Sequence, residues 1–371
     1  MGNSLVEQFE TERPDVQSDP APKVAFSLVS WKRWRDTVEC LESLRQQKYS
    51  NYLSVVVDNG SEDGSADRIR EWAEENLGLN RVIADYSREA ALQGGEAAIE
   101  AALEAAPPHA GLVLIRNREN LGFMGANNVV ISYALHRRAA ADYVFLLNND
   151  AVIDPDCLER LLAVDRSTRA GVLGALIMNR EDSQIEFAHS GNLRGLFFAP
   201  LLKAYTPMPN AGVPFWDSYF VNGGAMLARK DVLEAVRAAR GDYLEERLYL
   251  YWDEVVFCQT AREKGFRCLI VRAATVRHKV DRASCGYQSP LWYYYTGRNR
   301  VLLAKEFLPL GWQPLFHLTH VPLRIASMFK NLQARRYSCA RAVFWGLVDG
   351  YRGVTGKWKY HDEVTRDYGQ T

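Results

Sequence analysis

Short apolar runs alternate with amphipathic stretches along the first part of the chain. Between the runs, apolar residues recur at helical spacing in stretches such as 36–46 and 64–75. Because a strand that returns to a parallel sheet must cross over through a helix, this alternation predicts βαβ units. We therefore expect an α/β fold with a mostly parallel, doubly wound sheet and helices on both faces. The apolar runs are Val24–Val29, Leu53–Val57, Leu112–Ile115 and Tyr143–Leu147.

Strand-like runs and helical patterns continue to about residue 300, and the composition then changes. Residues 301–360 are rich in Leu, Phe and Trp, and their longest uncharged run, Phe307–Leu323, contains three prolines. Since proline interrupts the hydrogen bonds of a helix interior, this run is not expected to cross a membrane. The pattern divides the chain into a disordered lead-in at 1–22, two sheet-forming parts at 23–165 and 166–300, and a helical extension at 301–371.

The charge balance is zero over the whole chain but uneven along it. Lys and Arg together number 45, as do Asp and Glu, so no global field favours nucleic acid, and none is expected as a partner. Residues 298–360, however, carry eleven basic and two acidic side chains, a net charge of +9, and the remainder carries −9. A basic, aromatic-rich amphipathic extension suits the surface of an anionic membrane. The alternative is a solvated helical face packed on the main body.

Neither the N-terminal residues nor the cysteines indicate export. Residues 1–22 carry five acidic side chains against one basic one, and they lack the basic and apolar segments of a signal peptide. The six cysteines lie far apart without a CxxC pair, which favours reduced thiols over a disulfide framework or a zinc site. We therefore expect a cytoplasmic protein, whose basic extension would allow peripheral attachment at the inner face of the cytoplasmic membrane.

Polar side chains follow two of the apolar runs, where the strands are expected to end. Asp58 follows one run, and Asn148, Asn149 and Asp150 follow another. In α/β sheets the ligand crevice lies at the carboxyl ends of the strands. Oxygen ligands there suit a phosphate-bearing substrate with a divalent cation, and Asp150 is the best candidate ligand; the alternative is that these residues only form turns. The Ala/Glu-rich stretch 89–106 predicts an exposed helix without a chemical role.

Taken together, motifs at these and later positions resemble family 2 glycosyltransferases with the GT-A fold, in their rhamnosyltransferase-like branch. The resemblance covers about residues 24–300, with the motifs in the family's order and spacing. It implies a nucleotide-sugar-binding half at 23–165 and an acceptor-binding, catalytic half at 166–300. The motifs are Val29–Trp31, Val57–Ser65, Arg116–Asn128, Leu147–Asp150, Asn222–Leu227, Tyr251–Cys258, His278–Val280 and Ser289–Arg300.

The resemblance assigns the first strand ends to the nucleotide. Ser30 and Trp31, together with Asp58, would hold the base and the ribose. A carboxylate such as that of Asp58 can accept a hydrogen bond from a pyrimidine N3–H or a ribose hydroxyl. In the family a loop closes around the nucleotide, and glycines there let the backbone approach a ligand. Its counterparts here are Asn120, Gly122, Phe123 and Asn127.

The family's DXD motif corresponds to Asn148, Asn149 and Asp150. Its last acid binds Mn²⁺ or Mg²⁺, while the middle position faces the sugar or the ribose. With a single carboxylate in this motif, a further ligand is expected, and His278 matches the family's late histidine. Imidazole is compatible with Mn²⁺, and the donor diphosphate would complete the shell. The alternative for a lone histidine is a structural role.

An acidic pair is expected to supply the general base. Direct displacement with inversion needs one group that takes the proton of the acceptor hydroxyl, and the family places it in an acidic pair that opens a helix. Glu254 matches that position, which is normally Asp, and Asp253 remains a rival because the order of the two acids is reversed. The alternative is that both are helix N-terminal carboxylates favoured by the macrodipole.

Aromatic and small residues of the second half are expected to shape the sugar and acceptor pocket, although each could instead belong to the core or to a turn. Arg298 and Arg300 would hold the leaving diphosphate through bidentate hydrogen bonds, or simply begin the basic extension. The pocket residues are Trp216, Asn222, Gly223, Gly224 and Trp252.

The resemblance implies an inverting, metal-dependent glycosyltransferase. It favours transfer of L-rhamnose from dTDP-L-rhamnose to a hydroxyl of a bacterial glycan or a lipid-linked saccharide. UDP-sugar transfer by the same fold is an alternative, as is a non-catalytic protein that binds nucleotide or carbohydrate. A nucleotidyltransferase or an NAD-dependent dehydrogenase would need a glycine-rich loop after the first strand, where this chain has Val29-Ser-Trp-Lys-Arg33.

Overall fold

The computed structural model of the protein describes residues 21–181, 183–187, 192–199, 208–279 and 288–366. Residues 1–20 of the predicted disordered lead-in lie outside these ranges. The cysteines within them are buried and free, as the spacing predicts; they are Cys40, Cys157, Cys258, Cys268 and Cys339.

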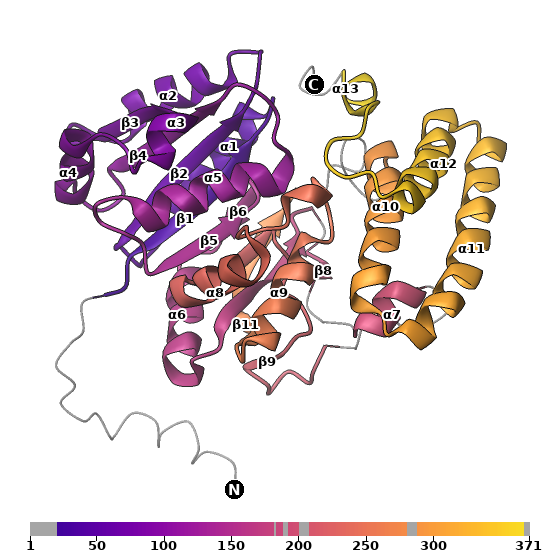
Figure 1. The fold of residues 1–371 in the computed structure, drawn as a ribbon. Helices are drawn as coiled ribbons and strands as arrows, with labels where there is room; N and C mark the ends of the chain where they lie inside the picture. Colours follow the sequence, from indigo (N-terminus) through magenta and orange to yellow (C-terminus); the bar gives the residue numbers. More distant parts are fainter. Residues whose placement is uncertain (1–20, 182, 188–191, 200–207, 280–287, 367–371) are drawn as a thin grey trace, which may run out of the picture.

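One sheet runs through the whole α/β body (Figure 1), in the strand order β3-β4-β2-β1-β5-β10-β7-β11-β6. Strands β1 to β5, β7 and β11 are parallel, whereas β10 and β6 run in the opposite direction. The predicted mostly parallel sheet of an α/β fold is therefore confirmed. The strands on this path are β1 (Val24–Ser30), β2 (Tyr52–Asn59), β3 (Val82–Ser87), β4 (Gly111–Asn117), β5 (Tyr143–Leu147), β6 (Ala151–Ile153), β7 (Gly171–Asn179), β10 (Ala225–Arg229) and β11 (Arg267–His278). Two short strands flank it, β8 (Ile185–Phe187) on β7 and β9 (Phe215–Asp217) on β11.

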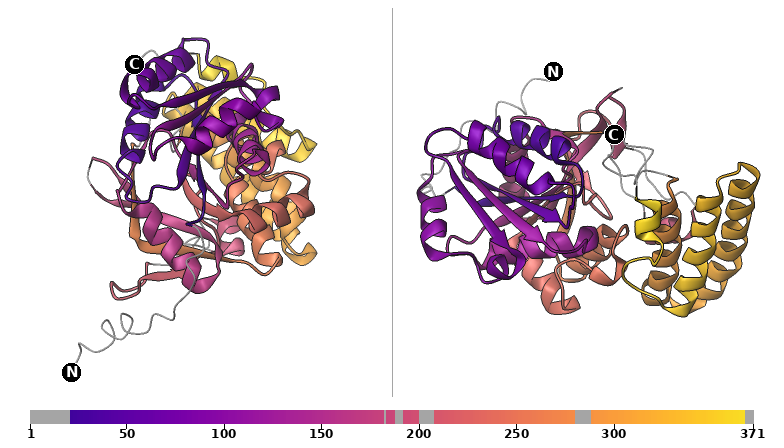
Figure 2. Two further views of the ribbon diagram at one scale, coloured as in Figure 1. Left: turned by 90° about the vertical axis from the view of Figure 1, so that its left-hand side faces the viewer. Right: turned by 90° about the horizontal axis from the view of Figure 1, so that it is seen from above.

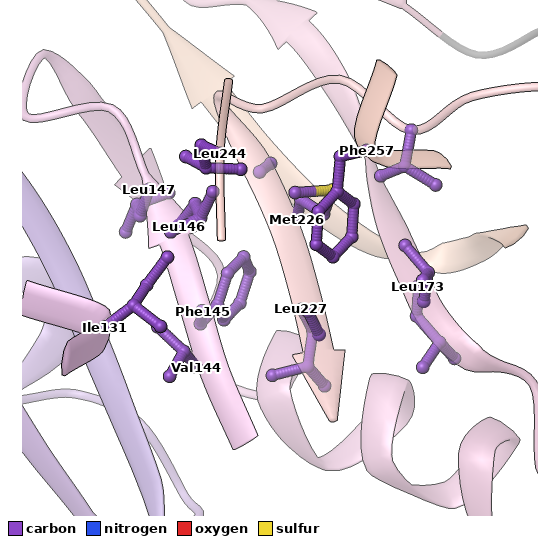
Figure 3. Packing of buried hydrophobic residues seen from close by; sticks show 14 of the residues in the cluster. Ile131, Val144, Phe145, Leu146, Leu147, Leu173, Met226, Leu227, Leu244 and Phe257 are labelled. Atoms are coloured by element: carbon purple, nitrogen blue, oxygen red, sulfur yellow. The ribbon is translucent and has the colours of Figure 1, made fainter. Parts of the chain in front are cut away.

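The core lies on both faces of this sheet and is centred on β5, every residue of which is buried. Phe145 of β5 stacks on Phe26 of β1 with ring centroids 5.1 Å apart. Figure 3 shows Phe145 beside Met226 and Leu227 of β10, where the parallel part of the sheet meets its antiparallel strand. An uninterrupted apolar run is expected for a central strand that is covered on both faces.

Helices cover both faces of the sheet. The Ser27 hydroxyl of β1 donates a hydrogen bond to Asn127 Oδ1 of helix α5 at 2.7 Å. The Ser30 hydroxyl accepts from Thr37 of α1 at 2.9 Å. Residues three apart on a strand point to opposite faces, so α1 and α5 lie on opposite sides. The helices of the body are α1 (Trp34–Leu44), α2 (Ser65–Asn76), α3 (Arg88–Leu92), α4 (Ala97–Ala105), α5 (Gly122–His136), α6 (Cys157–Thr168), α7 (Leu193–Phe198), α8 (Lys230–Arg240), η2 (Glu246–Leu248) and α9 (Asp253–Glu263).

The stretch predicted as one exposed helix at 89–106 forms two helices, α3 and α4, which pack on the body. Gly94 and Gly95 break the helix with φ angles of 89° and 81°. Glu100 of α4 is 1% exposed, accepts a hydrogen bond from Tyr133 and pairs with Arg137 at 2.7 Å. The structure thus has two helices where one was predicted; most of α4 is exposed, and its buried residues Glu100 and Leu103 attach it to the body.

Four helices and a short 3-10 turn form the C-terminal region, which stands beside the body in Figure 2. The predicted boundary after residue 300 falls inside a continuous helix, α10, and the boundary after 165 falls in the last turn of α6. Among the described residues, no helix is long and apolar enough to cross a bilayer. The elements are α10 (Pro290–Phe307), η3 (Leu310–Trp312), α11 (Gln313–Gln333), α12 (Tyr337–Arg352) and α13 (His361–Val364).

Candidate active site

Strand pairing brings two of the predicted metal ligands together. His278 ends β11 and pairs with Ala151 of β6, the residue after Asp150. As a result the His278 Nε2 atom lies 3.0 Å from Asp150 Oδ1, although the two residues are far apart in the sequence. The other ring nitrogen, Nδ1, lies 3.2 Å from Glu186 Oε2 on β8. The imidazole thus stands between two carboxylates.

The environment of His278 suits a cation. Burial opposes its protonation, but the hydrogen bonds with Asp150 and Glu186 outweigh burial and raise its pKa to about 10. Two atoms that converge on one point, an oxygen and an imidazole nitrogen, are donors that Mn²⁺ accepts. No group of three or more His, Cys, Asp and Glu side chains that could hold an ion occurs in the described part of the chain. By their chemistry, Asp150 and His278 are the residues here that could hold such an ion.

Asn148 and Asn149, which precede Asp150, form hydrogen bonds that link the Asp150–His278 pair to neighbouring elements. Asn148 Nδ2 lies 3.2 Å from His278 Nε2, and the Asn148 backbone N–H donates to the Gly224 carbonyl at 3.0 Å. Asn149 Nδ2 donates to Thr37 Oγ1 at 2.9 Å, and Thr37 in turn donates to Ser30. The Ser30 hydroxyl is fully buried, where it fixes the end of β1 against α1; that Ser30 helps to hold the nucleotide stays a prediction.

Asp58 is a buried carboxylate with one oxygen free for a ligand. One oxygen, Oδ2, accepts from the Ser61 backbone N–H at 3.1 Å, whereas Oδ1 is buried without a hydrogen-bond partner in the structure. Burial raises the pKa of Asp58 above its usual range. An unpartnered buried acceptor is costly, so a donor from a bound ligand would stabilise it. Trp31 lies nearby at the end of β1, with its ring centroid 5.8 Å from that of His361 in α13.

The loop predicted to close around the nucleotide forms hydrogen bonds with a second loop, which contains Tyr249. Asn120 Oδ1 accepts hydrogen bonds from Asn59 Nδ2, the Gly122 N–H and the Tyr249 hydroxyl, at 3.0, 2.9 and 3.0 Å. Gly122 has a φ of 75°, and a Cβ there would lie 2.4 Å from the Tyr249 carbonyl oxygen. The Phe123 N–H donates to that same carbonyl at 3.1 Å. Glycine is therefore required where the two loops meet.

Asn127, which was predicted to contact the nucleotide, lies inside the protein. Its side chain is 1% exposed. The oxygen accepts from Ser27, and the nitrogen donates to the Phe123 carbonyl at 2.9 Å. Both polar atoms are thus used inside the protein, where they hold the first turn of α5 against β1.

The acidic pair opens helix α9. Asp253 is 3% exposed, and its Oδ2 atom has no hydrogen-bond partner in the structure; Glu254 is half-buried. Burial raises the pKa of Asp253, and burial together with the neighbouring Asp253 charge raises the pKa of Glu254 well above its usual range. A carboxylate with raised basicity and partial exposure suits proton abstraction.

The loop before the pair has a strained backbone. Tyr249, Tyr251 and Trp252 have φ angles of 66°, 63° and 75°, a region that bulky side chains rarely adopt. Such strain persists only where the surroundings impose it, and it concentrates at functional sites. Here it directs the start of α9, and so the two carboxylates, toward the Asn222–Gly224 turn.

Hydrogen bonds from Arg298 and Asn299 of α10 hold the loop in this conformation. The Asn299 amide donates to the carbonyls of Leu248, Leu250 and Tyr251, at 3.2, 2.9 and 3.0 Å, and Arg298 donates to Leu248 at 2.6 Å and to Gly356. Arg298 is fully buried. The donors of Arg298, which was predicted to bind the diphosphate, are used by the Asn299 side chain and by backbone carbonyls.

Sequence reasoning overlooked Asn299, although it lies between Arg298 and Arg300 in a motif already singled out. Thr37, Glu186 and Tyr249 were overlooked as well, and no local pattern marks them. Their contacts depend on elements that are distant in the sequence, as Thr37 to Asn149 and Glu186 to His278 show.

The Asn222–Gly224 turn lies between the metal ligands and the acidic pair. A Cβ on Gly224 would lie 3.0 Å from Asn148 Nδ2, and one on Gly223 would lie 3.4 Å from the Phe123 ring and 3.9 Å from Asp253 Oδ2. Asn222 Oδ1 fixes the turn by accepting from the Gly224 N–H at 2.8 Å. These predicted pocket residues are therefore brought together with both candidate centres.

The two tryptophans predicted for the pocket have different positions. Trp252 precedes the acidic pair, packs on Phe197 with centroids 5.3 Å apart, and lies 5.7 Å from the Arg300 guanidinium. Trp216 pairs with Ile270 of β11. Ile270 precedes His278 by eight residues, which is roughly 25 Å along a strand. Trp216, which was predicted to line the pocket, is therefore placed toward the other end of β11 from His278.

Asp58 and Asp150 lie at the carboxyl ends of the parallel strands β2 and β5, the edge at which α/β sheets bind their ligands. The family model described as glycosyl transferase family 2 matches residues 28–107 and 96–237. The chain therefore belongs to glycosyl transferase family 2.

Similar proteins include the low-salt glycan biosynthesis hexosyltransferase Agl10 of Haloferax volcanii, 26% identical over 255 residues that cover 67% of this chain and 78% of Agl10. Among solved structures, the mannosyltransferase PcManGT of Pyrobaculum calidifontis, in complex with GDP-Man and Mn²⁺, has a TM-score of 0.52 and 16% identity, with 93% of this chain and 92% of that chain covered. GalNAc-T7 with UDP, GalNAc and Mn²⁺ has a TM-score of 0.55 and 12% identity, with 95% and 58% covered. The chain spans 42% of S. aureus TarS. The GT-A fold predicted from the sequence is thus confirmed.

Proposed function

We propose that this protein transfers one hexose, with inversion, from a nucleoside diphosphate sugar to a hydroxyl of a glycan or lipid-linked saccharide. One observation carries the proposal. Asp58, the Asp150–His278 pair and the Asp253–Glu254 pair lie in sequence along one edge of the sheet, joined by the Asn222–Gly224 turn. That order matches the parts of such a donor and its reaction: nucleoside, diphosphate, transferred sugar and attacking hydroxyl.

The nucleoside would bind at the ends of β1 and β2. Asp58 Oδ1 would accept a hydrogen bond from the base or the ribose, which supplies the partner that this buried oxygen lacks. We propose a dTDP-sugar, with L-rhamnose as the sugar, and UDP-sugars as the alternative, because both bases are pyrimidines that present an N3–H. The resemblance of the motifs to the rhamnosyltransferase-like branch supports the first choice.

Asp150 and His278 would hold a divalent cation, Mn²⁺ or Mg²⁺, whose bound charge would neutralise the diphosphate as it leaves. The Mn²⁺ in the structures of PcManGT and GalNAc-T7 supports this assignment. Glu186 would accept the Nδ1–H of His278 and thereby keep Nε2 free for coordination. Arg300, which lies beside Trp252, remains the arginine proposed to meet the departing phosphates.

Glu254 is proposed as the general base. It would take the proton of the acceptor hydroxyl while that oxygen forms a bond to the anomeric carbon and the bond from this carbon to the diphosphate oxygen breaks. Asp253 would hold Glu254 in place and raise its basicity, because its buried charge opposes a second one beside it. A displacement of this kind inverts the configuration at the sugar carbon.

A donor panel tests the proposal without knowledge of the acceptor. Release of nucleoside diphosphate from dTDP-, UDP- and GDP-sugars would be measured with Mn²⁺, and turnover is expected to be fastest with dTDP-L-rhamnose.

The Glu254→Gln variant should lose about 100-fold or more in turnover, while Glu263→Gln, an exposed position on the same helix, should not change it. Full activity in both Glu254→Gln and Asp253→Asn would refute the site, and preference for a UDP-sugar would refute only the choice of donor.

A further inference from the structure

Helix α11 buries polar side chains and exposes apolar ones. The residues of α11 that are buried are Phe316, His320, Arg324 and Asn331, three of which are polar. The outer face carries Leu315, Leu318, Pro322, Ile325, Phe329 and Leu332, and all six are exposed. A helix on the surface of a protein in water has the opposite arrangement.

The exposed residues form one continuous stripe. Their spacing of three, four, three, four and three residues keeps them on one side of the helix along nearly its whole length. Leu318 is 73% exposed and Phe329 is 55% exposed. We call these six side chains the outer apolar surface. Figures 1 and 2 show α11 at the edge of the molecule that is farthest from the sheet.

Exposed apolar residues are concentrated in this part of the molecule. Among the described residues, the large hydrophobic side chains that are exposed elsewhere are Leu79, Leu92 and Ile185. On α12, next to α11, Tyr337, Phe344 and Tyr351 are exposed at intervals of seven residues, so they share one side of that helix. The Tyr351 hydroxyl lies 2.7 Å from His317 Nδ1 of α11, which places the two exposed sets side by side.

The charge of this region is positive, and one of its basic side chains, Arg341, is paired with Glu363 of α13. No Asp or Glu occurs from residue 307 to residue 348, a segment that carries Arg324, Lys330, Arg335, Arg336 and Arg341. Lys330 and Arg335 are exposed next to the end of the outer apolar surface. Neither has an ion-pair partner among the residues that the structure describes. A water-soluble protein partner could cover the outer apolar surface. The exposed basic residues next to it, in a segment without Asp or Glu from 307 to 348, favour an anionic surface instead.

We propose that the outer apolar surface of α11 inserts into the interfacial region of an anionic lipid membrane, with the helix lying in the membrane plane. Apolar side chains of such a helix enter the boundary between headgroups and acyl chains, while basic side chains meet the headgroups. The buried Arg324 of α11 donates a hydrogen bond to the Tyr293 carbonyl of α10, so this side of the helix packs on the protein. The helix therefore lies on the membrane and does not cross it.

Vesicle co-sedimentation of the full chain tests this inference. With vesicles of phosphatidylcholine containing about 30% phosphatidylglycerol, the protein should bind, and binding should weaken as salt increases. The Phe329→Glu and Leu318→Glu variants should each bind at least tenfold more weakly. The Leu79→Glu variant provides the matched control, since Leu79 is 97% exposed but lies on the body, and it should bind like the unmodified chain.

A second pair of substitutions separates the charge from the apolar contact. Lys330→Gln with Arg335→Gln should reduce binding to anionic vesicles, by about fivefold for each charge, and should abolish its salt dependence while leaving donor hydrolysis unchanged. Donor hydrolysis and melting temperature show that the variants fold. The inference is overturned if the unmodified chain does not bind, if Leu79→Glu impairs binding as much as Phe329→Glu, or if sedimentation velocity shows a dimer that Phe329→Glu dissociates while vesicle binding is absent.

Discussion

The carboxylates of Asp58, Asp150 and Asp253 differ in their hydrogen-bond partners, and their proposed roles differ accordingly. Asp58 and Asp253 each keep one buried oxygen without a partner, which prepares them to receive a donor. Asp150 is engaged with His278. The sequence shows all three acids at the expected places, because apolar runs mark where strands end. It does not show which oxygen is free, since that depends on neighbours such as Ser61 that only the folded chain supplies.

The acidic pair makes a prediction about pH. Because the pKa of Glu254 is raised by burial and by Asp253, the base should be lost by protonation at a higher pH than for an ordinary carboxyl group. The acid limb of kcat/KM for transfer or hydrolysis should therefore lie above the usual range of glutamate. Asp253→Asn removes the neighbouring negative charge, so it should move this limb to lower pH.

The pH profile of Asp253→Asn also distinguishes the two acids. If activity is retained at high pH and the limb shifts downward, Glu254 is the base. If activity disappears at every pH while Glu254→Gln keeps it, Asp253 is the base and the proposed roles are reversed.

Glu186 should control metal affinity without contacting the metal. Its carboxylate orients His278 through Nδ1, and loss of such a partner typically weakens metal binding by about 10- to 100-fold. Glu186→Gln should raise the Mn²⁺ concentration needed for half-maximal donor hydrolysis by that factor, with little change at saturating Mn²⁺. An exposed acid nearby on the chain, Glu181, provides the control as Glu181→Gln. An unchanged Mn²⁺ requirement in Glu186→Gln would remove it from the site.

At the scale of elements, the loop from Leu248 to Trp252 determines the geometry of the site. Its strained backbone is held by Asn299 and Arg298 of α10 on one side, and it contacts the Gly122 loop on the other. The sequence suggests the helix that follows, because Asp253 and Glu254 are typical of a first turn. It does not indicate that α10 holds the loop, because the sequence alone does not distinguish a buried arginine such as Arg298 from an exposed one.

Asn299→Ala should therefore reduce both stability and turnover. It leaves the carbonyls of Leu248, Leu250 and Tyr251 without this donor, at about 1–3 kcal/mol for a buried group, and it frees a strained loop beside the base. We expect a lower melting temperature and a fall of about 100-fold in kcat with a smaller change in KM. Asn331→Ala is the matched control, because Asn331 is also buried but lies on α11. It should affect the melting temperature alone; an equal effect on kcat would show that Asn299 acts only through stability.

At the scale of the molecule, the helical C-terminal region packs against residues of the proposed site. Trp358 is 1% exposed and stacks on Tyr294 at 4.5 Å, and His361 packs between Trp31 and Tyr249. The sequence predicted the helices and the net charge of +9, but several of those charges are internal or paired. Arg298 is buried, and Arg341 pairs with Glu363. Composition alone cannot separate such charges from the exposed ones on α11.

Trp358→Ala should test this integration. Removing a fully buried tryptophan costs about 3–5 kcal/mol, and here it also loosens His361 against Trp31. We expect a lower melting temperature and a raised KM for the sugar nucleotide, measured by hydrolysis. Arg352→Ala, an exposed position at the end of α12, should change neither. A variant at 358 that melts earlier but keeps its KM would limit the region to a structural role.

Residues 356–361 pack against the end of the first strand and against the loop before α9, although they are translated much later than either. The Gly356 N–H donates to the Arg247 carbonyl, and His361 contacts Trp31, so the proposed donor pocket needs residues that are translated well after α9. A nascent chain that has emerged only as far as α9 has its carboxylates but not the contacts that place them. Such a chain should hydrolyse no sugar nucleotide until the later helices have emerged and packed.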